Sequence, residues 1–121
     1  MDIEEFDFED DFADILAKDS RYHPRAYTVL LNVFGFLSEK TQGHVSGEDI
    51  LEEFKEEVLD QFGPMAYTVL TEWGLKCTED IGEMMVNLVE SNRIVKEDND
   101  SYESFAGGYD FRETFSGPYQ A

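Results

Sequence analysis

The segments Pro24–Leu30 and Pro64–Leu70 read PRAYTVL and PMAYTVL, and they are identical at six of seven positions with an offset of 40 residues. An aromatic residue, Tyr22 or Phe62, stands two positions before each copy. A period near 40 with two helical patterns per unit is typical of helix-pair repeats. Because two copies are too few for an extended solenoid, the sequence predicts a compact bundle of two related helix pairs, over residues 22–62 and 62–92.

The first unit carries clear start and stop signals. Pro24 suits the first turn of a helix, where the missing N–H has no helical partner. Apolar residues at helical spacing follow it, and Phe36 belongs to a second apolar face, so we expect this helix to be buried on both sides. A second helix is predicted after Ser46, which is its N-cap with Asp49 three residues on, and it extends to Phe62.

The second unit repeats this pattern in a shorter form. A helix that begins at Pro64 is predicted to end at Gly74. Thr78 is then the predicted N-cap of the clearest amphipathic helix in the chain. That helix is expected to end near Ser91–Asn92, with the Met84–Met85 pair on its core side.

The helical spacing ends after residue 92. Arg93–Lys96 and Tyr102–Phe105 are predicted to pair as a small hairpin, and Tyr109–Phe115 to form a last helical turn or an extended arm. An N-terminal helix is expected over about Glu9–Lys18. The 121 residues therefore predict one mainly helical domain, with residues 1–8 and 116–121 loose at its ends.

The composition disfavours several classes of function. The chain has 28 Asp and Glu against nine Lys and Arg, a net charge of −19. This charge repels phosphate groups, which disfavours binding to nucleic acid and to anionic lipid. No apolar run is long enough to span a bilayer, and the first residues lack the positive region of a secretory signal. With Cys77 as its single cysteine, the chain is expected to be cytoplasmic.

Several short motifs resemble those of a family of small bacterial repeat-containing proteins. They include DSRY at Asp19–Tyr22, HVSG at His44–Gly47, FG at Phe62–Gly63, EDIG at Glu79–Gly82 and GYDF at Gly108–Phe111. The resemblance extends over residues 6–115. It implies a bacterial cytoplasmic protein, but it brings no catalytic residue, cofactor or substrate, because the family has no assigned activity.

No pattern in the sequence indicates catalysis or metal binding. His23 and His44 lack the spacing of metal ligands and are expected to pack in loops or to cap helices. No base is placed beside Cys77, which is expected to be a small buried residue. The acidic segment Asp98–Glu103 does not match the ligand spacing of an EF-hand loop. We therefore predict no cofactor, no metal and no enzymatic activity.

The order of elements in the second half suggests one alternative, a winged helix-turn-helix. In DNA-binding members of that class, Lys and Arg hold the recognition helix against phosphates. The corresponding helix here, Thr78–Ser91, carries acidic charges only. Winged-helix descent would thus predict a regulatory module that does not bind DNA directly, with Arg93, Lys96 and Arg112 on one face.

Aromatic residues alternate with acidic residues at both ends of the chain, as in segments that bind a basic, grooved protein surface. The candidate partner-binding residues are Phe6, Phe8, Tyr109, Phe111 and Tyr119. The alternative is that these rings pack on the domain's own core, which we favour for Phe12 and Phe111. The leading prediction is a non-catalytic interaction module with an acidic, aromatic-bearing surface. Its partner would be a basic protein or a second copy of the chain, and mimicry of nucleic acid is a variant of this hypothesis.

Overall fold

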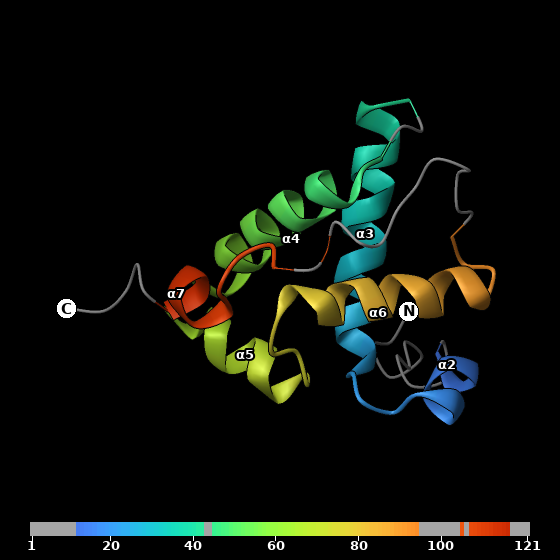
Figure 1. Cartoon of the computed structure of the whole chain (residues 1–121), viewed down its shortest axis with the longest axis horizontal. Helices are drawn as coiled ribbons and strands as arrows, with labels where there is room; N and C mark the ends of the chain where they lie inside the picture. Colours follow the sequence, from blue (N-terminus) through green and yellow to red (C-terminus); the bar gives the residue numbers. More distant parts are fainter. Residues whose placement is uncertain (1–11, 43–44, 95–104, 106, 117–121) are drawn as a thin grey trace, which may run out of the picture.

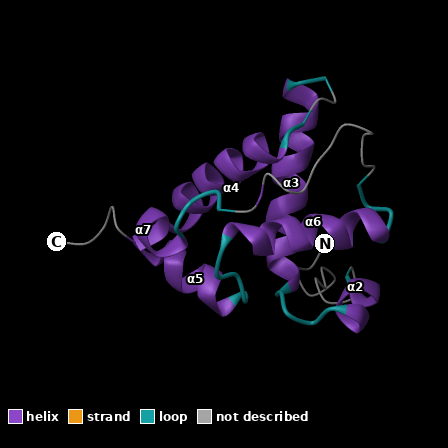
Figure 2. Cartoon of the chain, viewed as in Figure 1, coloured by secondary structure: helices purple, strands orange, loops and turns teal. Residues whose placement is uncertain are grey.

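A computed structural model describes residues 12–42, 45–94, 105 and 107–116 (Figure 1). The elements are α2 (Ala13–Lys18), α3 (Pro24–Lys40), α4 (Gly47–Phe62), the 3-10 turn η2 (Gly63–Met65), α5 (Ala66–Glu72), α6 (Thr78–Glu90) and α7 (Phe111–Ser116). These residues contain helices and loops but no strand (Figure 2). The mainly helical class is therefore confirmed. No helix in this part of the chain is both long enough and apolar enough to cross a membrane.

Two predicted elements fall largely outside the described residues. The hairpin would occupy residues 93–105, of which 95–104 are not described, and its flanks at Arg93, Ile94 and Phe105 are not strand. The N-terminal helix was expected from Glu9, and the structure describes this region only from Phe12, the N-cap of α2. The winged-helix arrangement and the full extent of the N-terminal helix stay predictions.

α3 and α4 begin with side-chain caps that the sequence indicates locally. The imidazole Nδ1 of His23 accepts a hydrogen bond from the Arg25 N–H at 3.0 Å, and Pro24 occupies the first helical position. Ser46 accepts one from the Asp49 N–H at 3.0 Å, as predicted. Each cap satisfies a backbone donor that the first turn leaves without a partner.

The expectation that α3 is buried on both sides is wrong for Phe36, whose ring is 50% exposed. Val29 and Val33 are buried, so the apolar stripe of α3 is wide but does not reach the outer side of the helix. The Lys40 ammonium lies 5.8 Å from the centre of the Phe36 ring. Periodicity gives the side of a helix on which an apolar residue lies, but it does not guarantee that another element covers that side.

The second unit differs from the first in its helix starts. Pro64 lies in the 3-10 turn η2, and α5 has 7 residues where α3 has 17. Gly74 follows α5 with a φ of +90°, which agrees with the predicted stop. The N-cap of α6 is Cys77 and not Thr78, because the Asp80 carboxylate accepts the Lys76 and Cys77 N–H groups and fixes the first turn one residue earlier.

One hydrophobic core joins all the helices. Its members include Ile15 of α2, Leu30 of α3, Phe54 of α4, Leu70 of α5, Met84 and Met85 of α6, and Phe115 of α7. The methionine pair is 0–2% exposed, as expected of core residues. Burial of these apolar faces supplies the main free energy of folding and fixes which side of each helix faces water.

The segment that leads to α7 closes over this core through the buried hydroxyl of Thr78. That hydroxyl donates a hydrogen bond to the Phe105 carbonyl oxygen and accepts one from the Gly108 N–H at 3.0 Å. A Cβ atom at Gly108 would lie 2.6 Å from Leu51 Cδ1 and 3.1 Å from Thr78 Cγ2, so a larger residue here would have to displace the end of the Leu51 side chain. Thr78 therefore anchors the C-terminal segment to the start of α6.

We predict that Thr78→Val lowers the free energy of unfolding by about 1–2 kcal/mol, because a buried hydrogen bond to the Phe105 carbonyl and a part-buried one from the Gly108 N–H are lost. Urea denaturation measures this change. The matched control is Thr71→Val on the exposed side of α5, where the hydroxyl bonds only to the Tyr67 carbonyl of its own helix. Equal effects of the two variants would show that Thr78 does not anchor the segment.

Candidate functional site

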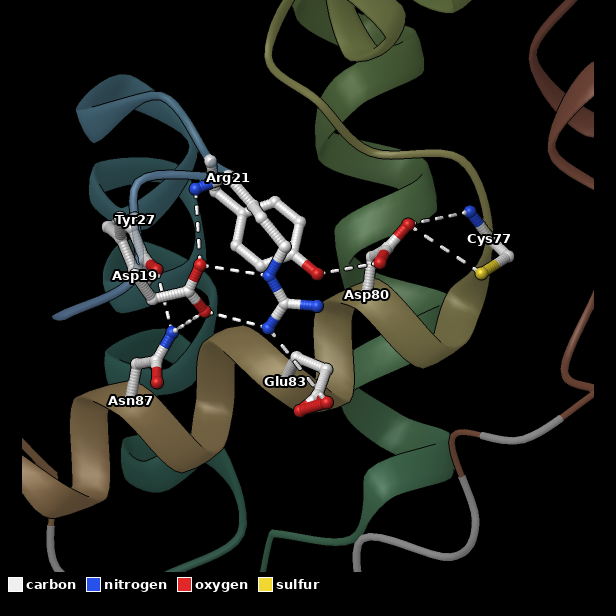
Figure 3. A network of polar contacts seen from close by, with 8 residues as sticks. Asp19, Arg21, Tyr27, Cys77, Asp80, Glu83 and Asn87 are labelled. Carbon is white, nitrogen blue, oxygen red and sulfur yellow. Dashed lines mark hydrogen bonds and ion pairs between the residues drawn. The ribbon is translucent and has the colours of Figure 1, made fainter. Parts of the chain in front are cut away.

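A network of polar side chains joins the loop between α2 and α3 to the side of α6 (Figure 3). Asp19 lies at its centre. The Arg21 guanidinium donates to both carboxylate oxygens of Asp19, at 2.9 Å from Nε and 2.7 Å from Nη2. The Asn87 amide nitrogen donates to Asp19 and to the Tyr27 hydroxyl, each at 3.0 Å. This part of the network links α3 and α6 through a carboxylate that is largely removed from water.

The other part of the network lies at the N-terminal end of α6. The Tyr22 hydroxyl donates to Asp80 Oδ1 at 2.6 Å. The second oxygen of Asp80 accepts the N–H groups of Lys76, at 2.8 Å, and of Cys77, at 3.3 Å. Both oxygens of this carboxylate are therefore used within the protein.

Three residues of α6 form the face of the helix that contacts the loop before α3. Asp80, Glu83 and Asn87 have the spacing i, i+3 and i+7, which places them on one face of a helix. Arg21 lies over that face, with Nη2 at 4.0 Å from a Glu83 carboxylate oxygen. The loop before α3 is thus fixed along almost two turns of α6.

The local electrostatics hold these groups in one protonation state. The hydrogen bonds from Arg21, followed by that from Asn87, hold the pKa of Asp19 well below its ordinary value. Burial, followed by the hydrogen bond and charge of Asp80, raises the pKa of Tyr22, and burial raises that of Tyr27. At neutral pH Asp19 is charged and the two tyrosines are neutral, so none of the three is poised to transfer a proton.

Cys77 lies beside this network but is not an activated nucleophile. Its Sγ atom is 3.6 Å from Asp80 Oδ2. Burial and the neighbouring acidic charges raise the pKa of the thiol, which keeps it protonated at neutral pH. In the described part of the chain, no cluster of three His, Cys, Asp or Glu side chains could hold a metal ion.

A hollow of about 380 Å³ opens at the junction, lined by Arg21, Tyr22, Gly74, Lys76 and Asp80. The Tyr22 hydroxyl and the Asp80 carboxylate are already bonded to each other, and a Cβ atom at Gly74 would lie 2.1 Å from the Arg21 carbonyl oxygen. We therefore interpret the junction as a structural contact that holds the α2–α3 loop, in the first half of the chain, against α6 and the loop before it, in the second half.

The structure describes two of the five candidate partner-binding residues, Tyr109 and Phe111. Phe6, Phe8 and Tyr119 lie outside the described residues. Tyr109 is half-buried, its hydroxyl donates to the Leu51 carbonyl at 3.0 Å, and its ring is 5.9 Å from that of Phe111. Phe111 and Phe12 are 3% and 4% exposed and belong to the core, as favoured for these two rings. Phe111 therefore does not present its ring to a partner.

The histidines were expected to cap helices or to pack in loops. His23 does both, because it caps α3 and its ring stacks on that of Trp73 with 6.4 Å between centres. His44 lies outside the described residues.

The sequence did not point to the Asp19–Arg21–Asn87 junction. Asp19 and Asn87 are 68 residues apart, and nothing in the local pattern pairs them. The i, i+3, i+7 spacing of Asp80, Glu83 and Asn87 on this amphipathic helix was the available signal.

Comparisons with protein-family models, with curated proteins and with solved structures found no match. The family resemblance of the motifs stays a prediction.

We predict that Asp19→Asn lowers the free energy of unfolding by about 1–2 kcal/mol at pH 7, a value reduced by the solvent exposure of Arg21. Because the folded protein depresses the pKa of Asp19, the stabilisation is complete well above the unfolded value of 3.8 and is lost progressively as the pH falls from there toward the lower folded value. Denaturation of both proteins at pH 7, about pH 3 and about pH 2 tests this.

The control for that experiment is Asp60→Asn, an exposed acid of α4. It should change stability little at any of these pH values. A difference between wild type and Asp19→Asn that stays constant from pH 7 down to about pH 2 would contradict the assigned role of Arg21.

We also predict that iodoacetamide modifies Cys77 more slowly at pH 7.5 in the folded protein than in the urea-unfolded chain, because the raised pKa lowers the thiolate fraction. Mass spectrometry follows the reaction, and the unfolded chain in urea is its own control. Faster modification of the folded protein would mean that Cys77 is an activated nucleophile.

Proposed function

We propose that this protein is a non-catalytic interaction module that binds a basic protein through an acidic surface. The observation that carries the proposal is the outward side of α4. It holds seven carboxylates: Glu48, Asp49, Glu52, Glu53, Glu56, Glu57 and Asp60. We call these residues the acidic face of α4. Within the described chain, its one ion pair is that of Glu52 with Lys55, at 3.0 Å.

The core fixes the direction of this face. Ile50, Leu51, Phe54 and Val58 are buried on the opposite side of α4, so the helix cannot rotate its carboxylates inward. From Glu48 to Asp60, at 1.5 Å per residue, the helix holds the charges in a row about 18 Å long. A preorganised row of like charges steers an oppositely charged partner and fixes its register.

The acidic face weakens the helix that carries it. Five pairs of acids are spaced i, i+4 along α4: 48 with 52, 49 with 53, 52 with 56, 53 with 57, and 56 with 60. Each like-charge pair costs about 0.2–0.5 kcal/mol in a helix. Nothing in the packing of α4 requires this cost. A basic partner would remove it on binding, and this supports a role for the acidic face in recognition.

The same repulsion bears on the identity of the partner. Two copies of the chain that met through this face would bring like charges together, so a basic protein is favoured over a second copy. No observation favours the regulatory winged-helix alternative. Arg93 pairs with Asp14 of α2 at 2.9 Å beyond the C-terminal end of α6, whereas Arg112 belongs to α7 on the far side of the molecule (Figure 1).

Affinity capture from nuclease-treated native lysate at low salt tests the proposal with two variants. The first, Glu53→Gln/Glu56→Gln/Asp60→Asn, removes charge from the acidic face of α4. The second, Glu39→Gln/Glu72→Gln/Glu113→Gln, removes three exposed charges elsewhere, so both carry a net charge of −19 + 3 = −16. We expect wild type and the second variant to retain a basic protein that the first variant loses. Added salt should release it.

Equal loss of the captured protein from both variants would show non-specific attraction to net charge, and it would contradict a specific surface. No capture of a basic protein by wild type, or capture that appears only in a parallel sample without nuclease, would overturn the proposed function.

A further inference from the structure

A pocket of about 210 Å³ lies between α2 and the C-terminal end of α6. Asp14, Ile15 and Lys18 line it from α2, and Asn87, Glu90 and the residues that end α6 line it from the other side. We propose that this pocket binds a lysine side chain of the basic partner. The inference rests on the proposed function, since it names the chemical group by which that partner would be anchored.

The α6 side of the pocket offers hydrogen-bond acceptors. The Asn87 nitrogen is used by Asp19 and Tyr27, so its carbonyl oxygen is left, and it points away from both of them (Figure 3). The Ser91 hydroxyl donates to the Leu88 carbonyl at 3.1 Å, which leaves its oxygen lone pairs as acceptors. The Glu90 carboxylate is exposed and has no ion pair within the described chain.

Two further features of the pocket favour a lysine: the helix end at its wall and the apolar residue in its lining. It lies at the negative end of the dipole of the 13-residue helix α6, which favours cations, and the carbonyls of Asn87, Leu88 and Val89 there already accept N–H groups of the turn that ends the helix. Ile15 lines the pocket but is only 3% exposed, so it adds a small apolar area beside these acceptors. A lysine that enters the pocket would place its ammonium among the oxygens, with its flexible stem extending toward solvent.

The geometry favours lysine over arginine. Both oxygens of Asp14 are already engaged by the Arg93 guanidinium, at 2.9 Å each, so Asp14 has no free edge for a second two-point guanidinium contact. An ammonium donates three hydrogen bonds in separate directions and suits acceptors that are spread around a pocket. At about 30 Å³ per water the volume corresponds to about seven waters, which is room for a lysine side chain.

Among the described residues that line the pocket, Lys18 is the one cation, and its charge opposes the entry of a second cation. Its side chain is exposed and has a flexible stem, so it can turn toward water when a partner lysine enters. The two charges should therefore have opposite effects on the affinity for lysine. Removal of the Lys18 charge should strengthen binding, whereas removal of the Glu90 charge should weaken it.

The test is a nuclear magnetic resonance titration of the full chain with N-acetyl-lysine methylamide. We expect saturable shift changes at the backbone amides of residues 14–18 and 87–92. N-acetyl-norleucine methylamide, which has the same stem without the ammonium, should not produce them, and the arginine analogue should bind more weakly than lysine. Equal shifts with norleucine, or shifts that spread over α4 without saturation, would overturn the inference.

Three variants sharpen the test. Glu90→Gln should weaken lysine binding by about threefold, the effect of one exposed charge, and Lys18→Gln should strengthen it. Glu72→Gln on α5 makes the same charge change as Glu90→Gln away from the pocket and should leave the affinity unchanged. Equal affinities of the Glu90 and Glu72 variants would overturn the inference.

The two proposals can fail separately. If the lysine titration fails while capture still depends on the acidic face of α4, only the pocket is wrong. If lysine binds as expected while capture fails, the pocket stands as an ammonium site and the proposed function is wrong.

Discussion

The hydrogen bond between Tyr22 and Asp80 is the contact on which the arrangement of the two halves depends. One oxygen of Asp80 holds the buried tyrosine, and the other holds the backbone at the start of α6. Asp80 alone therefore connects the loop before α3 to α6, and the contacts of Asp19 and Arg21 add to this connection. Gly74 is part of the same constraint, because its φ of +90° and its missing Cβ let the α5–α6 loop pass against the Arg21 carbonyl. The position of Asp19 opposite Asn87 follows from this junction.

The parts of the fold that the sequence predicted are those set by neighbours in the chain. The Ser46 cap and the Gly74 stop depend on groups a few residues away, and both were predicted correctly. The Thr78 cap was wrong because the Asp80 carboxylate starts α6 one residue earlier, while the Thr78 hydroxyl bonds to the Phe105 carbonyl, 27 residues further on. Periodicity placed Phe36 on an apolar face, but no element covers it in the described structure. The local sequence pattern therefore predicts where helices begin and end, but it does not predict which distant residues they contact.

The repeat shows the same limit at a larger scale. Tyr27 and Tyr67 occupy equivalent positions in nearly identical segments, yet Tyr27 is fully buried against Asn87 and Tyr67 is only half-buried. The difference begins before the second segment. Gly63 adopts a φ of +49° at the end of α4, and a 3-10 turn precedes the short α5. Similar sequences thus start helices of different length. The junction uses Tyr27, but the repeat does not require Tyr67 to make an equivalent contact. The junction could therefore not be derived from the repeat.

The carboxylates of this chain divide into two groups, and the division connects the fold with the proposed role. Asp19 and Asp80 are satisfied inside the protein, by a guanidinium, an amide, a hydroxyl and backbone N–H groups. They fix the two halves together, and each of their four oxygens already accepts a hydrogen bond within the protein. The acids of α4 lie on a helix whose opposite side is buried, and within the described chain only Glu52 among them has an ion pair. Their mutual repulsion opposes the helix in the free protein and would be relieved by a cationic surface. The first group therefore accounts for structure, and the second is the part of the charge that folding leaves available for recognition.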